Sequence, residues 1–215
     1  MIFKLGTRRY SPQRIFCIGK NYAEHIKELG GNAPGQPVVF MKPVTSLVPP
    51  GEIIQMPSHG NNLHHEVEVV VLIGKAGRDI SESAAALHIA GLTLGLDLTL
   101  RDVQSDLKKK GHPWEMSKAF DHSAPCGYPV AFDGSIPLNN LSFECRVNGE
   151  VRQTGNTGEM MFSVSTLIHY LSGIWRLQQG DLIFTGTPAG VGPLKSGDRV
   201  TLHSDPLGTF EWSLA

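Results

Sequence analysis

Glu66 and Glu68 stand two residues apart at the start of a run of valines, in the segment NLHHEVEVVV at residues 62–71. In an extended strand, residues two apart point to the same side and are separated by about 6.6 Å. Two carboxylates on one face of a half-buried strand repel each other unless a cation neutralises them. Carboxylates are the usual protein ligands of Mg²⁺, so the pair predicts a metal site that needs a third ligand from another segment.

Asp97 is the candidate for that third ligand, because it is a lone acid in the otherwise apolar segment GLTLGLDLTL at residues 91–100. Two other interpretations stay open. Asp97 would also serve as the N-cap of a helix that begins near Thr99. Glu66 and Glu68 would also be tolerated on the solvated outer face of an edge strand. The spacing of the three acids excludes neither alternative.

His64 and His65 precede the glutamates and suggest two further kinds of metal site. His64-x-Glu66 matches the start of a zinc deaminase signature, but that signature also requires Pro-Cys-x-x-Cys. The Pro125-Cys126 pair has no second cysteine at the required spacing, so the deaminase interpretation fails. A cupin-like iron site would need a later histidine in a matching context, and the remaining histidines lie in unrelated segments.

The composition is that of an ordinary globular chain, with 215 residues, 40% hydrophobic and 18% charged residues, and a formal net charge of −1. Binding to phosphate backbones relies on an excess of Lys and Arg, so we expect no nucleic-acid partner. The apolar runs fall short of the roughly 18 residues of a membrane helix, and residues 1–20 lack the pattern of a secretory signal. We therefore expect a cytoplasmic protein without membrane association, forming one domain over residues 1–215.

Cys17, Cys126 and Cys145 are odd in number, widely spaced and without a Cys-x-x-Cys pair. This pattern favours reduced thiols in the core over disulfides or a zinc site. We expect the three thiols to be chemically inert.

Strand patterns outnumber helix patterns along the chain. Asn148-Gly149 lies between two alternating segments in residues 141–155 and predicts a two-residue hairpin turn. Ser81 and Ser163 are suitable N-caps for two helices. The predicted helices occupy residues 21–30 (ended by Gly30 and Gly31), 81–90, 101–111 and 163–172, and predicted strands include residues 14–19, 38–43, 62–71, 91–100, 197–202 and 208–214. We expect a single α+β domain with a curled, mixed sheet and few helices.

The segment DLIFTGTPAGVGP at residues 181–193 is rich in glycine but matches neither a P-loop nor the G-x-G-x-x-G pattern of dinucleotide-binding proteins. Its glycines would let the backbone amides approach a ligand closely. A tight loop without any ligand is the alternative.

Six segments, taken in this order, resemble the fumarylacetoacetate hydrolase family from about residue 15 to the C-terminus. They are GKNYAEHIKELG (19–30), FMKP (40–43), HHEVEVVVLIGK (64–75), GLDLTLRDVQSDLKKKGHPWEMSKAFDHSAP (95–125), VNGEVRQTGNTGEMMFSV (147–164) and GDLIFTGTPAGVGP (180–193). The chain looks most similar to the short branch of acylpyruvate hydrolases and oxaloacetate decarboxylases. The resemblance implies a mixed β-sandwich or β-roll of the family's C-terminal domain type, in a homodimer.

The resemblance also implies a metal triad of Glu66, Glu68 and Asp97 that holds Mg²⁺ or Mn²⁺, in agreement with the charge argument. It assigns His25 and Glu28 to a water-activating pair. These two residues lie on a helix within a mobile lid, which we place at residues 15–37.

Further residues match polar positions of the family's site. The resemblance gives Lys118 a catalytic role in stabilising an oxyanion. It places substrate contacts at Lys42, Arg101, Gln104 and Thr187, the last through its hydroxyl and backbone. The neighbouring lysines at 108–110 are expected to be a solvated run.

The implied activity is metal-dependent hydrolysis or decarboxylation that cleaves C–C bonds of small 2-oxo acids, such as acylpyruvates and oxaloacetate, through a pyruvate enolate on the metal. An isomerase or decarboxylase of 2-hydroxyhepta-2,4-diene-1,7-dioate, or a fumarylpyruvate hydrolase, is the enzymatic alternative. A catalytically silent protein that only binds metal and carboxylates is the alternative from another class.

Overall fold

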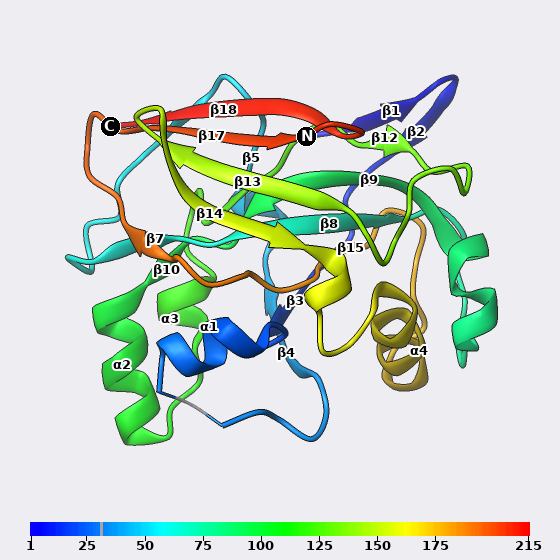
Figure 1. Ribbon diagram of the computed structural model, residues 1–215, viewed down its shortest axis with the longest axis horizontal. Coiled ribbons are helices and arrows are strands. Elements are labelled where there is room, and N and C mark those ends of the chain that lie inside the picture. Colours follow the sequence, from blue (N-terminus) through cyan, green and yellow to red (C-terminus); the bar gives the residue numbers. More distant parts are fainter. Residues whose placement is uncertain (31) are drawn as a thin grey trace.

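The computed structural model describes residues 1–30 and 32–215, and its strands form two larger sheets that lie one over the other, with three small sheets at their edges (Figure 1). The six-stranded sheet has the order β12 (Val130–Ala131), β9 (Ile89–Leu96), β8 (Val67–Ile73), β15 (Leu182–Phe184), β3 (Ile15–Gly19) and β4 (Val38–Lys42). The five-stranded sheet has the order β14 (Glu150–Asn156), β13 (Ser142–Val147), β17 (Arg199–Ser204), β18 (Gly208–Leu214) and β6 (Ile53–Ile54). Both sheets are mixed, because β15 runs parallel to β3 and β18 parallel to β6.

The small sheets and the helices complete the fold. The small sheets pair β1 (Phe3–Leu5) with β2 (Arg8–Tyr10), β7 (Leu63–His65) with β10 (Thr99–Leu100) and β16 (Gly192–Pro193), and β5 (Leu47–Val48) with β11 (Ala124–Pro125). The helices are α1 (Ala23–Glu28), η1 (Val44–Ser46), η2 (Glu82–His88), α2 (Arg101–Lys110), α3 (Glu115–Lys118), η3 (Thr157–Glu159) and α4 (Val164–Ile174). The predicted α+β class with mixed sheets and few helices is confirmed.

The strand that carries the glutamates is central rather than peripheral. β8 pairs with β9 on one side and with β15 on the other, and all seven of its residues are buried. The edge-strand interpretation of Glu66 and Glu68 is therefore wrong. Side chains from both sheets, such as Val69, Leu94 and Leu202, share one apolar cluster, which fixes the position of this strand.

Local signals predicted most of the other elements. Asn148 and Gly149 have φ angles of 53° and 84°, which match the predicted two-residue turn between β13 and β14. Ser163 caps α4 by accepting a hydrogen bond from the Thr166 N–H. The predicted helix at 81–90 is instead the 3₁₀ helix η2, and the Ser81 side chain makes no capping bond. Gly31, predicted to end the first helix, lies outside the described residues.

The three cysteines are free and fully buried. Burial raises the pKa of Cys126, and burial together with Glu144 raises the pKa of Cys145 to about 12. The reactive thiolate is therefore scarce at neutral pH.

We expect a thiol reagent to find almost no reactive group in the native protein at about pH 8, and all three cysteines after denaturation. Absorbance titration with and without denaturant measures this. Rapid modification of Cys17, Cys126 or Cys145 in the native protein would contradict their burial.

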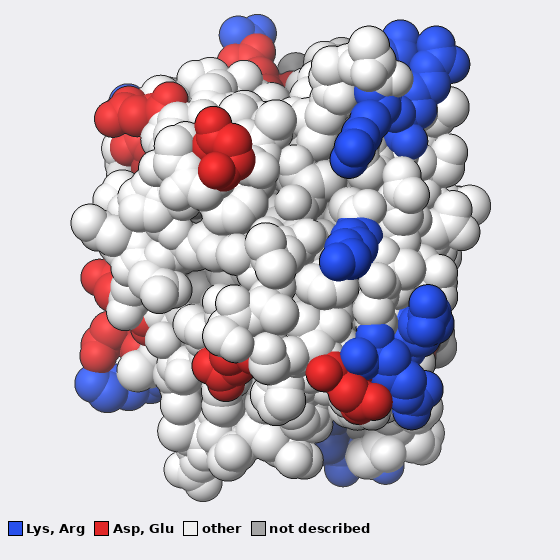
Figure 2. All heavy atoms as spheres, turned by 90° about the vertical axis from the view of Figure 1, so that its right-hand side faces the viewer, with Lys and Arg blue, Asp and Glu red and all other residues white. Residues whose placement is uncertain are grey.

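Figure 2 shows the side of the molecule that lies to the right in Figure 1, near α4 and η2. On this face most acidic side chains lie to the left and most basic ones to the right, with broad uncharged surface in the middle, and acidic and basic side chains meet at the lower right. Among the described residues, we find no helix with the length and apolar character needed to cross a bilayer.

Candidate metal and substrate site

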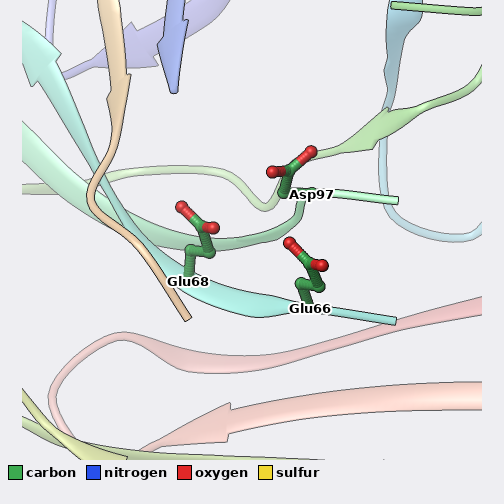
Figure 3. Close-up of side chains that lie close together, drawn as sticks. All are labelled: Glu66, Glu68 and Asp97. Carbon is green, nitrogen blue, oxygen red and sulfur yellow. The ribbon is translucent and has the colours of Figure 1, made fainter. Parts of the chain in front are cut away.

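Three buried carboxylates meet where β8 and β9 lie side by side. Glu66 precedes β8, Glu68 lies on it, and Asp97 follows the last residue of β9. The antiparallel register pairs Val67 with Leu96, and the Asp97 N–H donates to the Glu66 carbonyl at 2.9 Å. The three side chains point toward one another (Figure 3), and one ligand atom from each lies within 4.8 Å of the others.

Asp97 does not cap a helix. The N-cap of α2 is Leu100, and α2 has no side-chain capping bond. The N-cap alternative for Asp97 is therefore wrong, and its carboxylate turns toward Glu66 and Glu68.

Basic side chains surround two of the three carboxylates. Lys118 Nζ donates to Glu66 Oε2 at 2.8 Å and to Asp97 Oδ2 at 2.5 Å. Arg101 donates to Glu66 Oε1. Burial by itself would lower the pKa of Lys118, but Asp97 and Glu66 raise it above the ordinary range. The two carboxylates therefore favour the ammonium form of Lys118, which donates a hydrogen bond to each of them.

Glu66 and Glu68 differ in their tendency to hold a proton. Burial by itself would raise the pKa of Glu66, but Lys118 and Arg101 lower it below the ordinary range. Burial raises the pKa of Glu68 well above its ordinary value, and Asp97 and Glu66 raise it further. The Gly186 N–H donates to Glu68 at 2.8 Å, but within the described residues no ion pair includes Glu68. Glu68 therefore lacks a compensating positive charge.

The donor set fits a hard divalent cation. Asp97 Oδ1 is buried and lies 2.8 Å from Lys42 Nζ, yet it accepts no hydrogen bond of suitable geometry within the described part of the chain. An oxygen with a free lone pair, next to Glu68 and Glu66, is the kind of ligand that Mg²⁺ or Mn²⁺ prefers.

A cavity of about 490 Å³ opens beside the triad. Glu66 and Glu68 form part of its wall, and apolar side chains such as Ile18 and Phe40 form another part. Of the other predicted site residues, His25, Arg101, Gln104, Lys118 and Thr187 also line it. The structure therefore brings most of the predicted site residues to one cavity.

His25 reaches the cavity from α1, whose Ile26 also lines it. His25 is 5% exposed, and its Nδ1 lies 3.0 Å from Glu28 Oε2. The other Glu28 oxygen accepts a bond from the Gly190 N–H at 3.0 Å. Gly190 has a φ of 96°, and a Cβ there would lie 2.3 Å from the Arg152 carbonyl oxygen, so only glycine fits at this contact.

The predicted lid range contains two different structures. Its first five residues form β3, which pairs with β15 and β4 inside the six-stranded sheet. After β3, α1 contributes His25 and Ile26 to the wall of the cavity, to which the end of β3 contributes Ile18 and Gly19.

Lys42 lies behind the triad. Its side chain is fully buried, and its ammonium contacts Asp97 Oδ1 and donates to the carbonyls of Leu98 and Lys118. These contacts place Lys42 where it holds Asp97, and Lys42 is not among the residues that line the cavity.

Arg101 and Gln104 occupy one face of α2, as their spacing predicts. Arg101 donates to Gln104 Oε1 at 2.8 Å, and within the described residues its buried Nε has no hydrogen-bond partner. An unpaired guanidinium donor beside the triad favours an anionic ligand.

Lys108 belongs to the lysine run that the sequence places in solvent, and it is exposed as predicted, but it also lines the cavity. Its Nζ lies 5.2 Å from the centroid of the Trp114 ring. Burial, together with Arg101 and Lys118, lowers the pKa of Lys108. Helical spacing would have detected this, because Lys108 follows Gln104 by four residues and shares its face.

Gln153, on β14, is a further residue of the site that no sequence pattern indicated. Gln153 is 1% exposed and hydrogen-bonds to both the strand of the glutamates and the loop that carries Thr187. A lone glutamine in an alternating strand carries no signal of this role.

Comparison with known proteins gives concordant results. Residues 14–214 match the family model described as fumarylacetoacetate (FAA) hydrolase C-terminal. The chain is 45% identical over 197 residues to an oxaloacetate tautomerase of Escherichia coli, which covers 91% of this chain and 90% of that protein. It is 45% identical over 198 residues to a mitochondrial oxaloacetate decarboxylase of Dictyostelium discoideum, which covers 92% and 91%.

A solved structure supports the same assignment. The fumarylpyruvate hydrolase of Pseudomonas aeruginosa, in complex with Mn²⁺ and pyruvate, superposes with a TM-score of 0.94 at 35% identity, covering 100% of this chain and 95% of that one. This chain belongs to the fumarylacetoacetate hydrolase family.

Proposed function

We propose that this chain is a divalent-metal-dependent enzyme that acts on small 2-oxo acids, and that oxaloacetate is its best-supported substrate. The observation that carries the proposal is the buried triad of Glu66, Glu68 and Asp97 next to a cavity lined by His25 and several cations. Relatives that are 45% identical are named for reactions of oxaloacetate. A structural neighbour holds pyruvate, itself a 2-oxo acid, together with Mn²⁺.

Glu66, Glu68 and Asp97 would hold Mg²⁺ or Mn²⁺. When bound, the ion supplies a Lewis acid that stabilises negative charge on the 2-oxo oxygen of the substrate. The Lys118 ammonium adds a fixed positive charge beside it, and the Thr187 hydroxyl and the Arg101 guanidinium are in position to bind the substrate carboxylate.

His25 would move the proton in this site. Its Nδ1–H donates to the Glu28 carboxylate, which leaves Nε2 as the free base. In a keto–enol tautomerisation, Nε2 takes a proton from C3 of oxaloacetate, the electron pair of the C–H bond forms the C2=C3 double bond, and the π pair of the C=O bond moves to the 2-oxo oxygen. Return of the proton to that oxygen completes the enol. In an acylpyruvate, the same nitrogen takes a proton from a water that attacks the C4 carbonyl.

Tautomerisation, decarboxylation and C–C hydrolysis therefore use one set of residues. In each reaction, negative charge develops on the 2-oxo oxygen when a bond to C3 breaks. Decarboxylation of oxaloacetate breaks the C3–C4 bond without an attacking water, so it depends least on His25.

Two cavity cations favour a substrate with a second carboxylate. Lys20 and Lys108 line the cavity, and no ion pair within the described residues includes either of them. A second carboxylate, distant from the 2-oxo acid group, would neutralise this positive charge. Oxaloacetate has such a carboxylate at C4, whereas acetylpyruvate ends in an uncharged methyl group.

We expect Lys108→Met to reduce kcat/KM for oxaloacetate roughly tenfold, because a charge-assisted contact is lost. The value for acetylpyruvate should stay unchanged. Lys109→Met, one residue further along α2 and equally exposed but not among the residues that line the cavity, is the matched control. Steady-state kinetics with both substrates measures this, and equal losses for the two would contradict the assigned contact.

A longer dicarboxylate is the second candidate, favoured by the size of the cavity, about 490 Å³. Structural neighbours include a fumarylpyruvate hydrolase and, at 34% identity, a 5-carboxymethyl-2-hydroxymuconate delta-isomerase of Mycobacterium smegmatis. Competition between oxaloacetate and fumarylpyruvate in one assay ranks the two by kcat/KM.

We also propose that residues 1–215 form one catalytic domain that works as a cytoplasmic homodimer. The free, buried cysteines support a reducing compartment. Light scattering coupled to gel filtration tests whether the protein is a dimer. A dimer is also expected of a catalytically silent binding protein, so this measurement does not separate that alternative from an enzyme. Catalysis of any oxaloacetate reaction above the rate with free Mn²⁺ contradicts that alternative and tests the proposed function.

A further inference from the structure

Gln153 is the only buried residue of β14. The register between β13 and β14 shifts next to it, since Cys145 pairs with Gln153 and Arg146 pairs with Val151. Arg152 is therefore an extra residue in a β-bulge. Bulges redirect a neighbouring side chain, and here the bulge accompanies a glutamine that points into the protein instead of solvent.

The orientation of the Gln153 amide is fixed by two backbone groups. The Val67 N–H can only donate, and it lies 3.1 Å from Oε1. The Pro188 carbonyl can only accept, and it lies 2.9 Å from Nε2. The oxygen therefore faces β8 and the amide nitrogen faces the loop after β15. His65 Nδ1, 2.9 Å from Oε1, must then be a donor as well.

This orientation determines which way the Thr187 hydroxyl donates. The second hydrogen of Gln153 Nε2 points at Thr187 Oγ1, 2.8 Å away, so the hydroxyl oxygen accepts from Gln153. Its own hydrogen must point elsewhere, and within the described residues no acceptor takes it. Thr187 is 4% exposed and lines the cavity.

We propose that Gln153 is a positioning residue, which holds Thr187 so that its hydroxyl hydrogen is presented to an anionic oxygen of the ligand in the cavity. The inference rests on the proposed function, because it requires a carboxylate ligand at this site. Gln153 also ties the strand of Glu66 and Glu68 to the loop of Thr187, so that one amide sets the distance between the carboxylates and the hydroxyl donor.

The test measures binding of oxalate, a stable analogue of a 2-oxo acid enolate, to the Mn²⁺-loaded protein by calorimetry. Thr187→Val and Gln153→Met should each weaken oxalate binding roughly 10- to 100-fold, the value of one hydrogen bond to a charged group. The double variant should be no weaker than the weaker single variant, because both changes remove the same donor. The affinity for Mn²⁺ alone should stay unchanged in all three.

Two control variants distinguish loss of the Thr187 hydroxyl donor from a general disturbance of the loop. Thr185 lies two residues earlier, is fully buried and donates to the Val69 carbonyl at 2.8 Å, away from the cavity. Thr185→Val should leave oxalate affinity unchanged. Thr187→Ser keeps the hydroxyl and should restore most of the affinity lost in Thr187→Val.

If Gln153→Met does not fold, Gln153→Glu provides the second variant. Its carboxylate still accepts from Val67 and His65, but toward Thr187 it can only accept, so the hydroxyl must turn away from the ligand. Oxalate affinity should fall as in Thr187→Val.

Three results would overturn the inference. They are additive losses in the double variant, normal oxalate binding by Thr187→Val, and normal oxalate binding by Gln153→Glu. Absence of oxalate binding by the Mn²⁺-loaded wild type would instead contradict the proposed function, together with the inference that rests on it.

Discussion

Glu68→Gln is expected to abolish metal binding and activity while leaving the metal-free protein as stable as the wild type. Burial, together with Asp97 and Glu66, raises the pKa of Glu68 and favours its protonated form when no metal is present. A glutamine has nearly the same shape and still accepts the hydrogen bond from the Gly186 N–H. It cannot supply the anionic oxygen that a hard cation requires.

Thermal unfolding measures both parts of this prediction. Mn²⁺ at about 100 times its Kd should stabilise the wild type by about 2.7 kcal/mol, or roughly 5–10 °C in Tm for a chain of this size. The Glu68→Gln variant should show the same Tm as the metal-free wild type and no shift with Mn²⁺. An unchanged Mn²⁺ shift in the variant would remove Glu68 from the metal site.

Glu66→Gln is the informative comparison, because this change should lower the stability of the metal-free protein, which Glu68→Gln should leave unchanged. Glu66 is the ionised partner of Lys118 and Arg101. Its neutralisation leaves the buried Lys118 and the partly buried Arg101 with less compensation, so the metal-free variant should itself lose stability, by about 3–5 kcal/mol. Equal Tm values for metal-free Glu66→Gln and Glu68→Gln would contradict the assigned charge states.

His25→Asn is expected to lower tautomerisation of oxaloacetate and cleavage of acetylpyruvate by roughly 10²- to 10⁴-fold, the usual contribution of general acid–base catalysis. Asparagine retains a donor for Glu28 but has no basic nitrogen. Decarboxylation of oxaloacetate should largely survive, because it needs no base at C3. Mn²⁺ should still bind, because His25 lies outside the triad.

A matched variant on the same helix controls for disturbance of α1. Lys27 and Glu24 form an exposed ion pair at 2.6 Å, on the side of α1 away from His25. Lys27→Ala should leave all three rates unchanged. Equal loss of all three rates in His25→Asn, or retention of all three, would contradict the role given to His25.

The sequence predicted the metal triad because its signal is local. Two acids at alternate positions of an apolar strand need a positive charge nearby to offset their repulsion. Asp97 is the other acid that lies inside an apolar segment close to them in the sequence. The choice between a buried site and a solvated edge could not be made from spacing. That choice depends on whether β8 has a partner on each side, and its second partner is β15, more than 100 residues away in the sequence.

The residues that support the site were harder to predict. Lys42 contacts Asp97, and Gln153 contacts Thr187, each from a strand that is distant in the sequence. No spacing pattern within one segment predicts such contacts. Lys108 is exposed, as its place in a run of three lysines predicts, but the run gives no sign that it also lines the cavity. Its entry into the cavity follows from the position of α2 beside Trp114, which tertiary packing sets.

The most direct test of the central claim follows oxaloacetate by ¹H NMR, which reports its keto form, its enol form and pyruvate at the same time. Samples contain purified protein with Mg²⁺, the Glu68→Gln variant with Mg²⁺, or the same total Mg²⁺ without protein. We predict that the wild type accelerates enol–keto exchange or pyruvate formation well above the free ion, and that Glu68→Gln does not. Equal rates in the three samples would contradict a metal-dependent enzyme of 2-oxo acids.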